Sequence, residues 1–111
     1  MFLGININGC LIIDAAFETS TVTGAKLAKA KASTSKFKSF GFEVETIDGH
    51  NFNEIYEALL NAKNSNKPYC IIANTIKGKG VSYMENNLDW HGNAPKGENL
   101  EIALKELGGE F

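Results

Sequence analysis

The chain has 111 residues, of which 43% are hydrophobic and 22% are charged, and its formal net charge is −2. This length gives about one small domain with its own core, and the ordinary composition excludes collagen-like, low-complexity and largely disordered proteins. No apolar run reaches the ~18–20 residues of a membrane-spanning helix, and Met1 to Ile5 lacks a basic region, so we expect neither a membrane segment nor a signal peptide. Two widely separated cysteines, Cys10 and Cys70, favour a reducing, cytoplasmic setting.

The first 35 residues carry few clear signals, and we leave them unassigned. Asn8-Gly9 between apolar residues predicts a two-residue hairpin turn, because both residues tolerate a positive φ. Leu11 to Ile13 have the composition of a buried strand. Alanine and lysine dominate residues 24–40 and favour a helix, which Gly41 would end. The five lysines of that stretch indicate a solvated helix face, with a nucleic-acid surface as the less favoured alternative.

From residue 36 onward the pattern is more orderly and alternates between strand and helix signals. Val44 to Ile47 predict a short strand. Asn51 is suited to cap a following helix, and Glu54 three residues later resembles a capping box. Tyr69 to Ala73 form a continuous apolar run, which is typical of a central parallel strand. Two strands joined by one helix imply a βαβ crossover, so we predict an α/β fold with a parallel sheet flanked by helices.

Two amphipathic helices are predicted from apolar residues at helical spacing, each with one apolar face. The face of the first helix comprises Phe52, Ile55, Tyr56, Leu59 and Leu60. The face of the last helix comprises Leu100, Ala103, Leu104 and Leu107, and Gly108-Gly109 would end that helix.

The polar loop from Thr75 to Pro95 is the candidate ligand site, because open α/β sheets bind ligands at the carboxyl ends of their strands. Lys77 to Gly80 read Lys-Gly-Lys-Gly, which suits an anion through close backbone approach and point charge; the alternative is a solvated lysine turn. His91 could donate to a phosphate or move a proton near neutral pH. We interpret His50 as a turn or cap residue before the first of the two predicted helices.

Four stretches, in this order, resemble the N-terminal section of transketolase, especially that of the split, two-subunit enzymes. They are Lys36–Val44, Ile47–His50, Thr75–Asn87 and Trp90–Pro95. The resemblance covers residues 36–111 and implies the C-terminal part of a thiamine-diphosphate-binding domain, with residues 1–35 as a diverged segment. It further implies thiamine diphosphate as the cofactor, contacts from Ile76, Gly78, Gly80 and His91, and a catalytic role for His91 through hydrogen bonding and proton transfer.

The resemblance also implies a reaction and its partners. The reaction would be transfer of a two-carbon ketol unit between sugar phosphates, as in the pentose phosphate pathway. The partner would be a transketolase C-terminal subunit or a second protomer, with neither nucleic acid nor membrane involved. The family's Mg²⁺ or Ca²⁺ motif, Gly-Asp-Gly followed by an asparagine, is absent, so we assign no metal ligand. We therefore expect the isolated chain to be inactive; the alternative is a non-catalytic α/β module that docks on a partner without binding cofactor.

Overall fold

The structure, a computed structural model, describes residues 2–5, 9–15 and 34–109. Its contacts divide the chain into two compact units, Met1–Thr75 and Ile76–Phe111. Within the described part of the chain, every helix is too short or too polar to cross a membrane.

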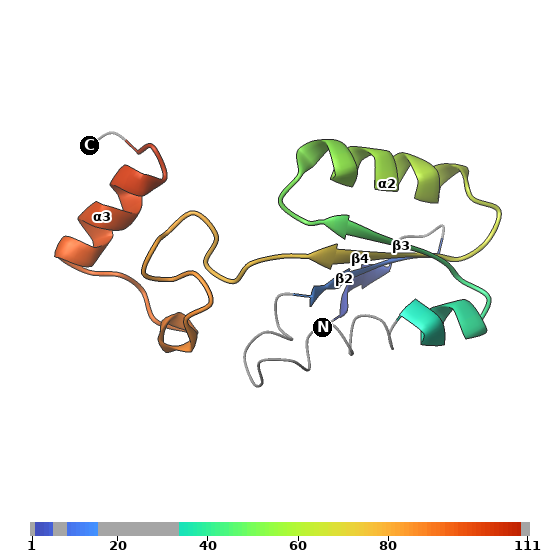
Figure 1. The fold of residues 1–111 in the computed structure, drawn as a ribbon, viewed down its shortest axis with the longest axis horizontal. Coiled ribbons are helices and arrows are strands. Elements are labelled where there is room, and N and C mark those ends of the chain that lie inside the picture. The colour runs from blue at the N-terminus through green and yellow to red at the C-terminus, as the bar shows by residue number, and fades with distance from the viewer. Residues whose placement is uncertain (1, 6–8, 16–33, 110–111) are drawn as a thin grey trace. The chain divides into compact units, whose positions relative to one another are not determined.

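The first unit is built on a four-stranded sheet with the strand order β1-β2-β4-β3 (Figure 1). The strands are β1 (Phe2–Ile5), β2 (Cys10–Asp14), β3 (Glu43–Asp48) and β4 (Tyr69–Asn74). Strands β2, β4 and β3 run parallel, and β1 pairs with β2 in the antiparallel direction. The predicted α/β fold with a parallel sheet is confirmed, and so is the central position of β4.

Strands β1 and β2 are consecutive in the chain and pair in the antiparallel direction, as the strands of a hairpin do. Ile5 lies opposite Leu11, and Gly9, just before β2, has a φ of +77°. The turn itself includes Asn8, which lies outside the described residues, so the predicted two-residue turn stays a prediction. Of the predicted helix over residues 24–40, the described part is helical at residues 34–39 and ends at Gly41, whose φ is +86°.

Side chains of the strands alternate between the two faces of the sheet, and each face has its own apolar cluster. On one face lies α2 (Phe52–Asn64), which Figure 1 shows above the strands. The buried cluster between α2 and the sheet consists of Ala58 and Ala62 from the helix and Cys10, Ile47, Tyr69 and Ile71 from the strands. On the other face Phe37, from the helical residues 34–39, packs against Leu11, Cys70 and Ile72. Because both faces are covered, β4 can be apolar along most of its length.

Helix α2 begins where the sequence predicts. The Asn51 side chain accepts hydrogen bonds from the backbone N–H groups of Asn53 and Glu54, at 3.0 and 3.3 Å. The Glu54 carboxylate accepts from the backbone N–H of Asp48 at 2.7 Å, which ties the helix to the end of β3. A capping box would instead direct that carboxylate to the backbone of the cap residue. The capping role of Asn51 is therefore confirmed, whereas the Glu54 carboxylate accepts from the backbone of Asp48 and not from that of Asn51.

The predicted apolar face of α2 is buried only in part, at Ile55 and Leu60, which are half-buried. Phe52, Tyr56 and Leu59 are 86%, 61% and 45% exposed, whereas Ala58 and Ala62 are the buried residues of the helix. Alanine has no side chain beyond Cβ, so these two positions let the helix backbone lie close to the sheet. Phe52, Tyr56 and Leu59 are then left exposed, whereas Ile55 packs against the buried cluster.

The second unit contains a short 3₁₀ helix and an α-helix joined by loops. These are η2 (Leu88–Trp90) and α3 (Glu98–Glu106). The last helix is confirmed, and Gly108 follows it with a φ of +73°. Its predicted apolar face is only partly buried: Ala103 is buried, while Leu100 and Leu107 are 40% and 61% exposed.

Candidate functional site

The carboxyl ends of the parallel strands are tied together within the first unit. The hydroxyl of Thr75, just after β4, donates to the carboxylate of Asp14 at the end of β2, at 2.5 Å. The backbone N–H of Gly49, just after β3, donates to the carbonyl of Asn74 at 2.7 Å. A Cβ at Gly49 would lie 2.5 Å from Cγ2 of Thr75. This edge of the sheet is therefore filled by its own side chains and backbone.

The turn predicted to approach the cofactor opens the second unit. The carbonyl of Ile76 accepts from the N–H of Lys79 at 3.1 Å, and the carbonyl of Gly78 accepts from the N–H of Val81 at 3.2 Å. Both glycines of the turn have positive φ, +70° at Gly78 and +96° at Gly80. Residues with a Cβ rarely adopt this conformation, so the backbone of the turn explains why both positions are glycine.

A carboxylate from the same unit closes this turn. The N–H of Gly80 donates to Oε1 of Glu85 at 3.1 Å, and Nζ of Lys79 lies 3.8 Å from the same oxygen. A Cβ at Gly78 would lie 2.5 Å from the carbonyl oxygen of Met84, so that glycine is packed against backbone. The backbone N–H and the ammonium group that would attract an anion thus already face Glu85. An external phosphate would have to displace this carboxylate.

His91 lies at the end of η2, in the same unit as the turn. Asn87 caps η2 by accepting from the N–H of Asp89 at 3.0 Å, and the N–H of His91 donates to the carbonyl of Leu88 at 2.9 Å. The His91 side chain is exposed. A hollow in the same unit is lined by Asp89, Trp90, Asn93, Ala94, Lys96 and Asn99.

Contacts with α3 and the segment before it hold the loop that carries His91. The rings of Tyr83 and Trp90 lie 4.9 Å apart, and the Tyr83 hydroxyl donates to the carbonyl of Asn99 at 2.6 Å. Ser82 donates twice to the Glu106 carboxylate, from its N–H at 2.7 Å and its hydroxyl at 2.6 Å. These two bonds lower the pKa of Glu106, while desolvation and the charge of Glu106 raise the pKa of Tyr83. Sequence reasoning missed these contacts, because partners so far apart along the chain leave no local pattern.

The predicted site residues thus lie in two segments of the second unit. Ile76, Gly78 and Gly80 belong to one turn, and His91 follows η2. His50 belongs to the first unit, in the turn before α2, where its N–H donates to Oδ1 of Asp48 at 2.9 Å. Its position agrees with the interpretation of His50 as a turn residue. The roles of the other four residues stay predictions.

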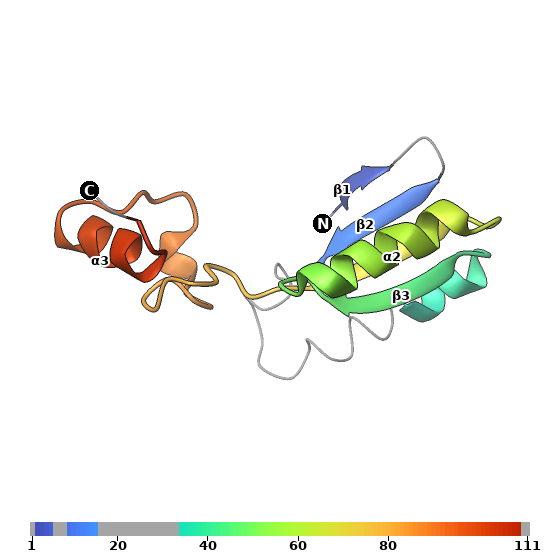
Figure 2. The same cartoon turned by 90° about the horizontal axis from the view of Figure 1, so that it is seen from above.

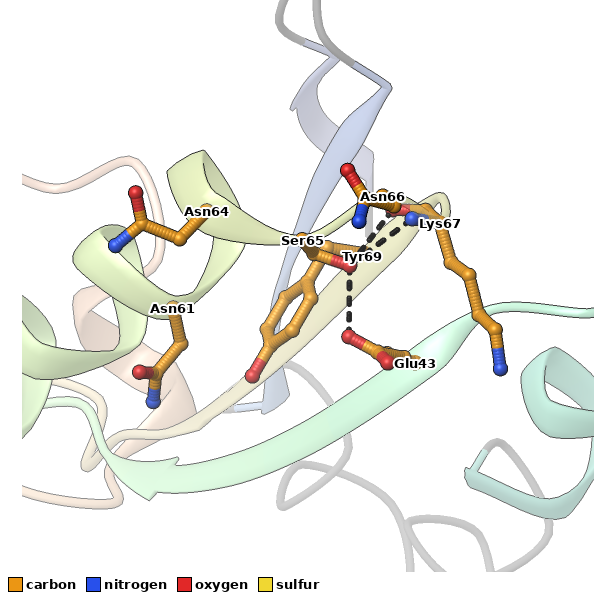
Figure 3. Close-up of a pocket in the computed structure, with 7 residues that line it drawn as sticks. All are labelled: Glu43, Asn61, Asn64, Ser65, Asn66, Lys67 and Tyr69. Atoms are coloured by element: carbon orange, nitrogen blue, oxygen red, sulfur yellow. Dashed lines mark hydrogen bonds between the residues drawn. The ribbon is translucent and has the colours of Figure 1, made fainter.

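A second polar hollow lies at the amino ends of β3 and β4 (Figure 3). It is lined by Glu43, Asn61, Asn64, Ser65, Asn66, Lys67 and Tyr69. The Ser65 hydroxyl donates to Glu43 at 2.7 Å, and the Tyr69 hydroxyl donates to Glu45 at 2.7 Å. Burial, followed by the bond to Glu45 and its charge, raises the pKa of Tyr69 to about 12. Open α/β sheets bind ligands at the opposite ends of their strands, so we interpret these bonds as stabilising.

The divalent metal that the resemblance implies does not fit the residues present. Across residues 2–5, 9–15 and 34–109, no group of three or more His, Cys, Asp or Glu side chains could hold a metal ion. Asp14, the acid at the end of β2, is bonded to Thr75. The sequence also contains no Gly-Asp-Gly. We therefore assign no metal ligand among the described residues.

Comparison with known proteins gives a consistent result. The family model described as transketolase, thiamine diphosphate binding domain, matches residues 15–110. An apulose-4-phosphate transketolase subunit from Actinobacillus succinogenes is 39% identical over 75 residues, which are 68% of this chain and 27% of that protein. The 6-deoxy-6-sulfo-D-fructose transketolase subunit SqwG of a Clostridium species is 44% identical over 73 residues, 65% of this chain and 26% of that protein. The 1-deoxy-D-xylulose-5-phosphate synthase of Wolinella succinogenes is 48% identical over 61 residues, 53% of this chain and 10% of that protein.

The chain spans about a quarter of the length of the first two of these relatives. The family match begins at residue 15 and so includes much of the segment that we left unassigned. It then continues through β3, α2, β4 and the whole loop that carries His91. Together with the helix-flanked parallel sheet, this match shows that the chain belongs to the transketolase family of thiamine-diphosphate-binding domains.

Proposed function

We propose that this chain supplies part of the thiamine-diphosphate-binding domain of a transketolase-type enzyme, which transfers a two-carbon ketol unit between sugar phosphates. The observation that carries the proposal is the family match over residues 15–110, which includes the loop after β4. We propose residues 36–111 as the C-terminal part of that domain and residues 1–35 as a diverged segment. The relatives' names contain different substrates, so the proposal stops at sugar phosphates as a class.

His91 is the residue to which we assign a catalytic role in this proposal. Its side chain is exposed at the end of η2, and an imidazole can donate a hydrogen bond from one ring nitrogen and accept one at the other. It could therefore donate to a phosphate or reacting oxygen, or transfer a proton. The backbone around Ile76, Gly78 and Gly80 is the proposed region of cofactor approach. We derive no reaction step through the cofactor, because the described residues contain no set of ligands for the metal that would bind its diphosphate.

The proposal includes a partner chain. Two relatives are named as transketolase subunits, which supports a C-terminal transketolase subunit or a second protomer as the partner. The alternative function is a non-catalytic module that docks on such a partner without cofactor. Two observations favour it: Glu85 already occupies the Lys79–Gly80 turn, and the described residues contain no metal-binding cluster.

A chimera separates the two functions. Residues 36–111 replace the corresponding section of a complete split transketolase, so that the host supplies the metal motif and the partner subunit. We expect the chimera to bind thiamine diphosphate and to catalyse ketol transfer, whereas the host without the section should do neither. A folded chimera that joins its partner yet binds no cofactor would favour the docking module.

The chain alone provides the matched measurement. Exposed lysine charges contribute little to binding, ~0–1 kcal/mol for a typical surface pair. Calorimetric titration with thiamine diphosphate and Mg²⁺ should therefore show no saturation up to about 1 mM, the concentration that corresponds to only ~4 kcal/mol of binding free energy. Micromolar, metal-dependent binding would contradict the expectation that the isolated chain binds the cofactor weakly or not at all.

A further inference from the structure

The 3₁₀ helix η2, which carries His91 at its end, has little packing of its own. Figure 2 shows it in orange as a short turn between the loop after β4 and α3. None of its three residues, all of which the structure describes, is buried, and Leu88 and Asp89 are exposed. A single 3₁₀ turn also has poorer hydrogen-bond geometry than an α-helix. The position of η2, and with it that of His91, therefore depends on the contacts that neighbouring residues make with it.

Asn87, the residue just before η2, makes two of these contacts with one side chain. Its Oδ1 accepts from the N–H of Asp89 at 3.0 Å and so caps the turn. Its Nδ2 donates to the carbonyl of Tyr83 at 3.1 Å. An asparagine amide carries both an acceptor oxygen and a donor nitrogen, so this half-buried residue can bind η2 and the loop before it at once.

Tyr83 is itself held by α3. Its hydroxyl donates to the carbonyl of Asn99, in the first turn of that helix, at 2.6 Å. Its ring lies 4.9 Å from the ring of Trp90, the last residue of η2. Tyr83 thus contacts η2 through Trp90 and receives the hydrogen bond from Asn87. Because the ring contact would remain, loss of the Asn87 amide should shift η2 and should not unfold the unit.

The residue before Asn87 connects the same place to the turn proposed to approach the cofactor. The N–H of Asn86 donates to the carbonyl of Lys77 at 2.9 Å, and Lys77 lies in the turn between Ile76 and Gly80. Asn86 has a φ of +55°, a conformation that asparagine tolerates better than most residues with a Cβ. The backbone at Asn86 and the side chain at Asn87 therefore join the two segments that carry the predicted site residues.

We propose that Asn87 is a positioning residue for His91. The proposal rests on the catalytic role proposed above for His91, and Asn87 itself contacts no reacting atom. Its amide determines where η2 lies relative to the turn, and so where the imidazole is presented. Misplacement of a reacting group by about 1 Å can cost ~10²-fold in rate, so a hydrogen bond that fixes such a group affects turnover. Cofactor binding at the turn should depend on Asn87 much less.

Amide hydrogen exchange of the complete chain, followed by NMR, tests the positioning without cofactor or partner subunit. Asn87→Ala should speed exchange of the His91 N–H, which donates to the carbonyl of Leu88, at least ~5-fold, because the turn loses its cap. The Gly80 N–H donates to Glu85, and its exchange should change less than ~2-fold if the unit stays folded.

Asn86→Gly is the matched control for this measurement. It removes the neighbouring asparagine side chain, which makes no hydrogen bond to the residues that the structure describes, and glycine adopts a φ of +55° readily. Exchange of the His91 N–H should change less than ~2-fold in this variant. Equal acceleration by Asn86→Gly and Asn87→Ala would overturn the proposal, since the effect would then not come from the Asn87 amide.

Turnover in the chimera distinguishes positioning from a general structural role. Asn87→Ala should lower kcat at least ~10-fold while the affinity for thiamine diphosphate changes less than ~3-fold. Adding Asn87→Ala to His91→Ala should lower kcat less than ~2-fold further, because residues that act through one another have non-additive effects. A general structural role would instead multiply the two losses.

Asn87→Asp separates the two hydrogen bonds of the amide. The carboxylate keeps the acceptor for the N–H of Asp89 but places an oxygen against the carbonyl of Tyr83. If both bonds hold η2, as proposed, this variant should also lower kcat, at least ~5-fold. If Asn87→Ala loses the fold, seen as lost protection of the Gly80 N–H, Asn87→Asp takes its place in every comparison.

Three results would overturn the proposal. They are unchanged exchange of the His91 N–H in Asn87→Ala, turnover within about twofold of the parent chimera, and losses that multiply in the double variant. A parent chimera without ketol transfer would instead count against the proposed function. The exchange measurement on the complete chain would then decide by itself whether Asn87 holds the segment that carries His91.

Discussion

Substitution of Gly49 by alanine tests the packing at the carboxyl ends of the strands. A Cβ at this position would lie 2.5 Å from Cγ2 of Thr75 and 3.1 Å from both Cβ of Ala73 and the carbonyl oxygen of Asn74. Favourable carbon contacts are ~3.5–4.0 Å, so the Thr75 contact alone would require a displacement of about 1 Å. Thr75 cannot turn away easily, because its hydroxyl donates to Asp14 on the neighbouring strand.

The cost follows from two opposed effects. Overpacking of this kind destabilises by ~1–3 kcal/mol, while replacing glycine by alanine stiffens the unfolded chain and returns ~0.4–1 kcal/mol. We expect Gly49→Ala to lower the free energy of unfolding by about 1–2 kcal/mol. Urea denaturation followed by circular dichroism measures it, with the transition midpoint lowered by roughly 0.5–1 M and the slope m unchanged.

The serine variant of Thr75 is the matched background. Thr75→Ser removes Cγ2 and keeps the hydroxyl that bonds to Asp14, so Gly49→Ala should cost clearly less in it. Gly41→Ala provides the contrast, since a Cβ there meets nothing within 4 Å but the φ is +86°. Its cost of ~1–2 kcal/mol comes from the backbone and should be the same in both backgrounds. A neutral Gly49→Ala, or one equally costly beside threonine and serine, would refute this reasoning.

Three further changes have outcomes that the structure determines. Tyr69→Phe should lower the free energy of unfolding by ~1–2 kcal/mol at pH 8, because it removes the hydrogen bond to Glu45. The pKa of Tyr69 is raised from 10.0 to about 12, so the stability difference between wild type and variant should shrink as the pH rises from 10 toward 12. A stability difference that is unchanged at pH 12 would contradict this contact. The hydrogen bonds from Ser82 lower the pKa of Glu106, so these bonds persist above the ordinary pKa of 4.5 and are lost at lower pH. An NMR titration of the Ser82 amide should therefore have its midpoint below pH 4.5, and a higher midpoint would disprove the contact. Gly78→Ala places a Cβ at a residue whose φ is +70°, 2.5 Å from a backbone oxygen, and should therefore destabilise the turn. Hydrogen exchange should show lost amide protection in the second unit. Unchanged protection would count against the described turn.

Local signals in the sequence were sufficient for the elements but not for the faces they bury. The side chain of Asn51 and the continuous apolar run of β4 each specify structure through neighbouring residues, and both predictions are confirmed. The buried face of α2 depends on which side of the helix lies close to the sheet. Small residues such as Ala58 and Ala62 allow that close approach, whereas hydrophobic periodicity favours the larger side chains. The close packing of the helix on the sheet, and not the spacing of the larger apolar residues, therefore decides which side of α2 is buried.

The candidate site shows the same division between local and distant contacts. Positive φ at Gly78 and Gly80 agrees with the turn that the Lys-Gly-Lys-Gly sequence predicts. The hydrogen bond from the Gly80 N–H to the Glu85 carboxylate could have been predicted, because the two residues are only five apart in the sequence. The bonds between Ser82 and Glu106 span 24 residues, and no local pattern indicates them. The roles of Ile76 and His91 depend on a cofactor, so the contacts within this chain leave them as proposals.

The most direct test of the transketolase assignment is the turnover of the chimera with His91 changed to alanine. The chimera carries residues 36–111 in a complete split transketolase, and it is compared with the same chimera that retains His91. A donor to charge that develops during reaction matters more in the transition state than in cofactor binding. We expect turnover to fall by ~10²-fold, with thiamine diphosphate affinity changed less than ~3-fold. Turnover within about twofold of the parent chimera, with the fold and cofactor binding intact, would contradict the account.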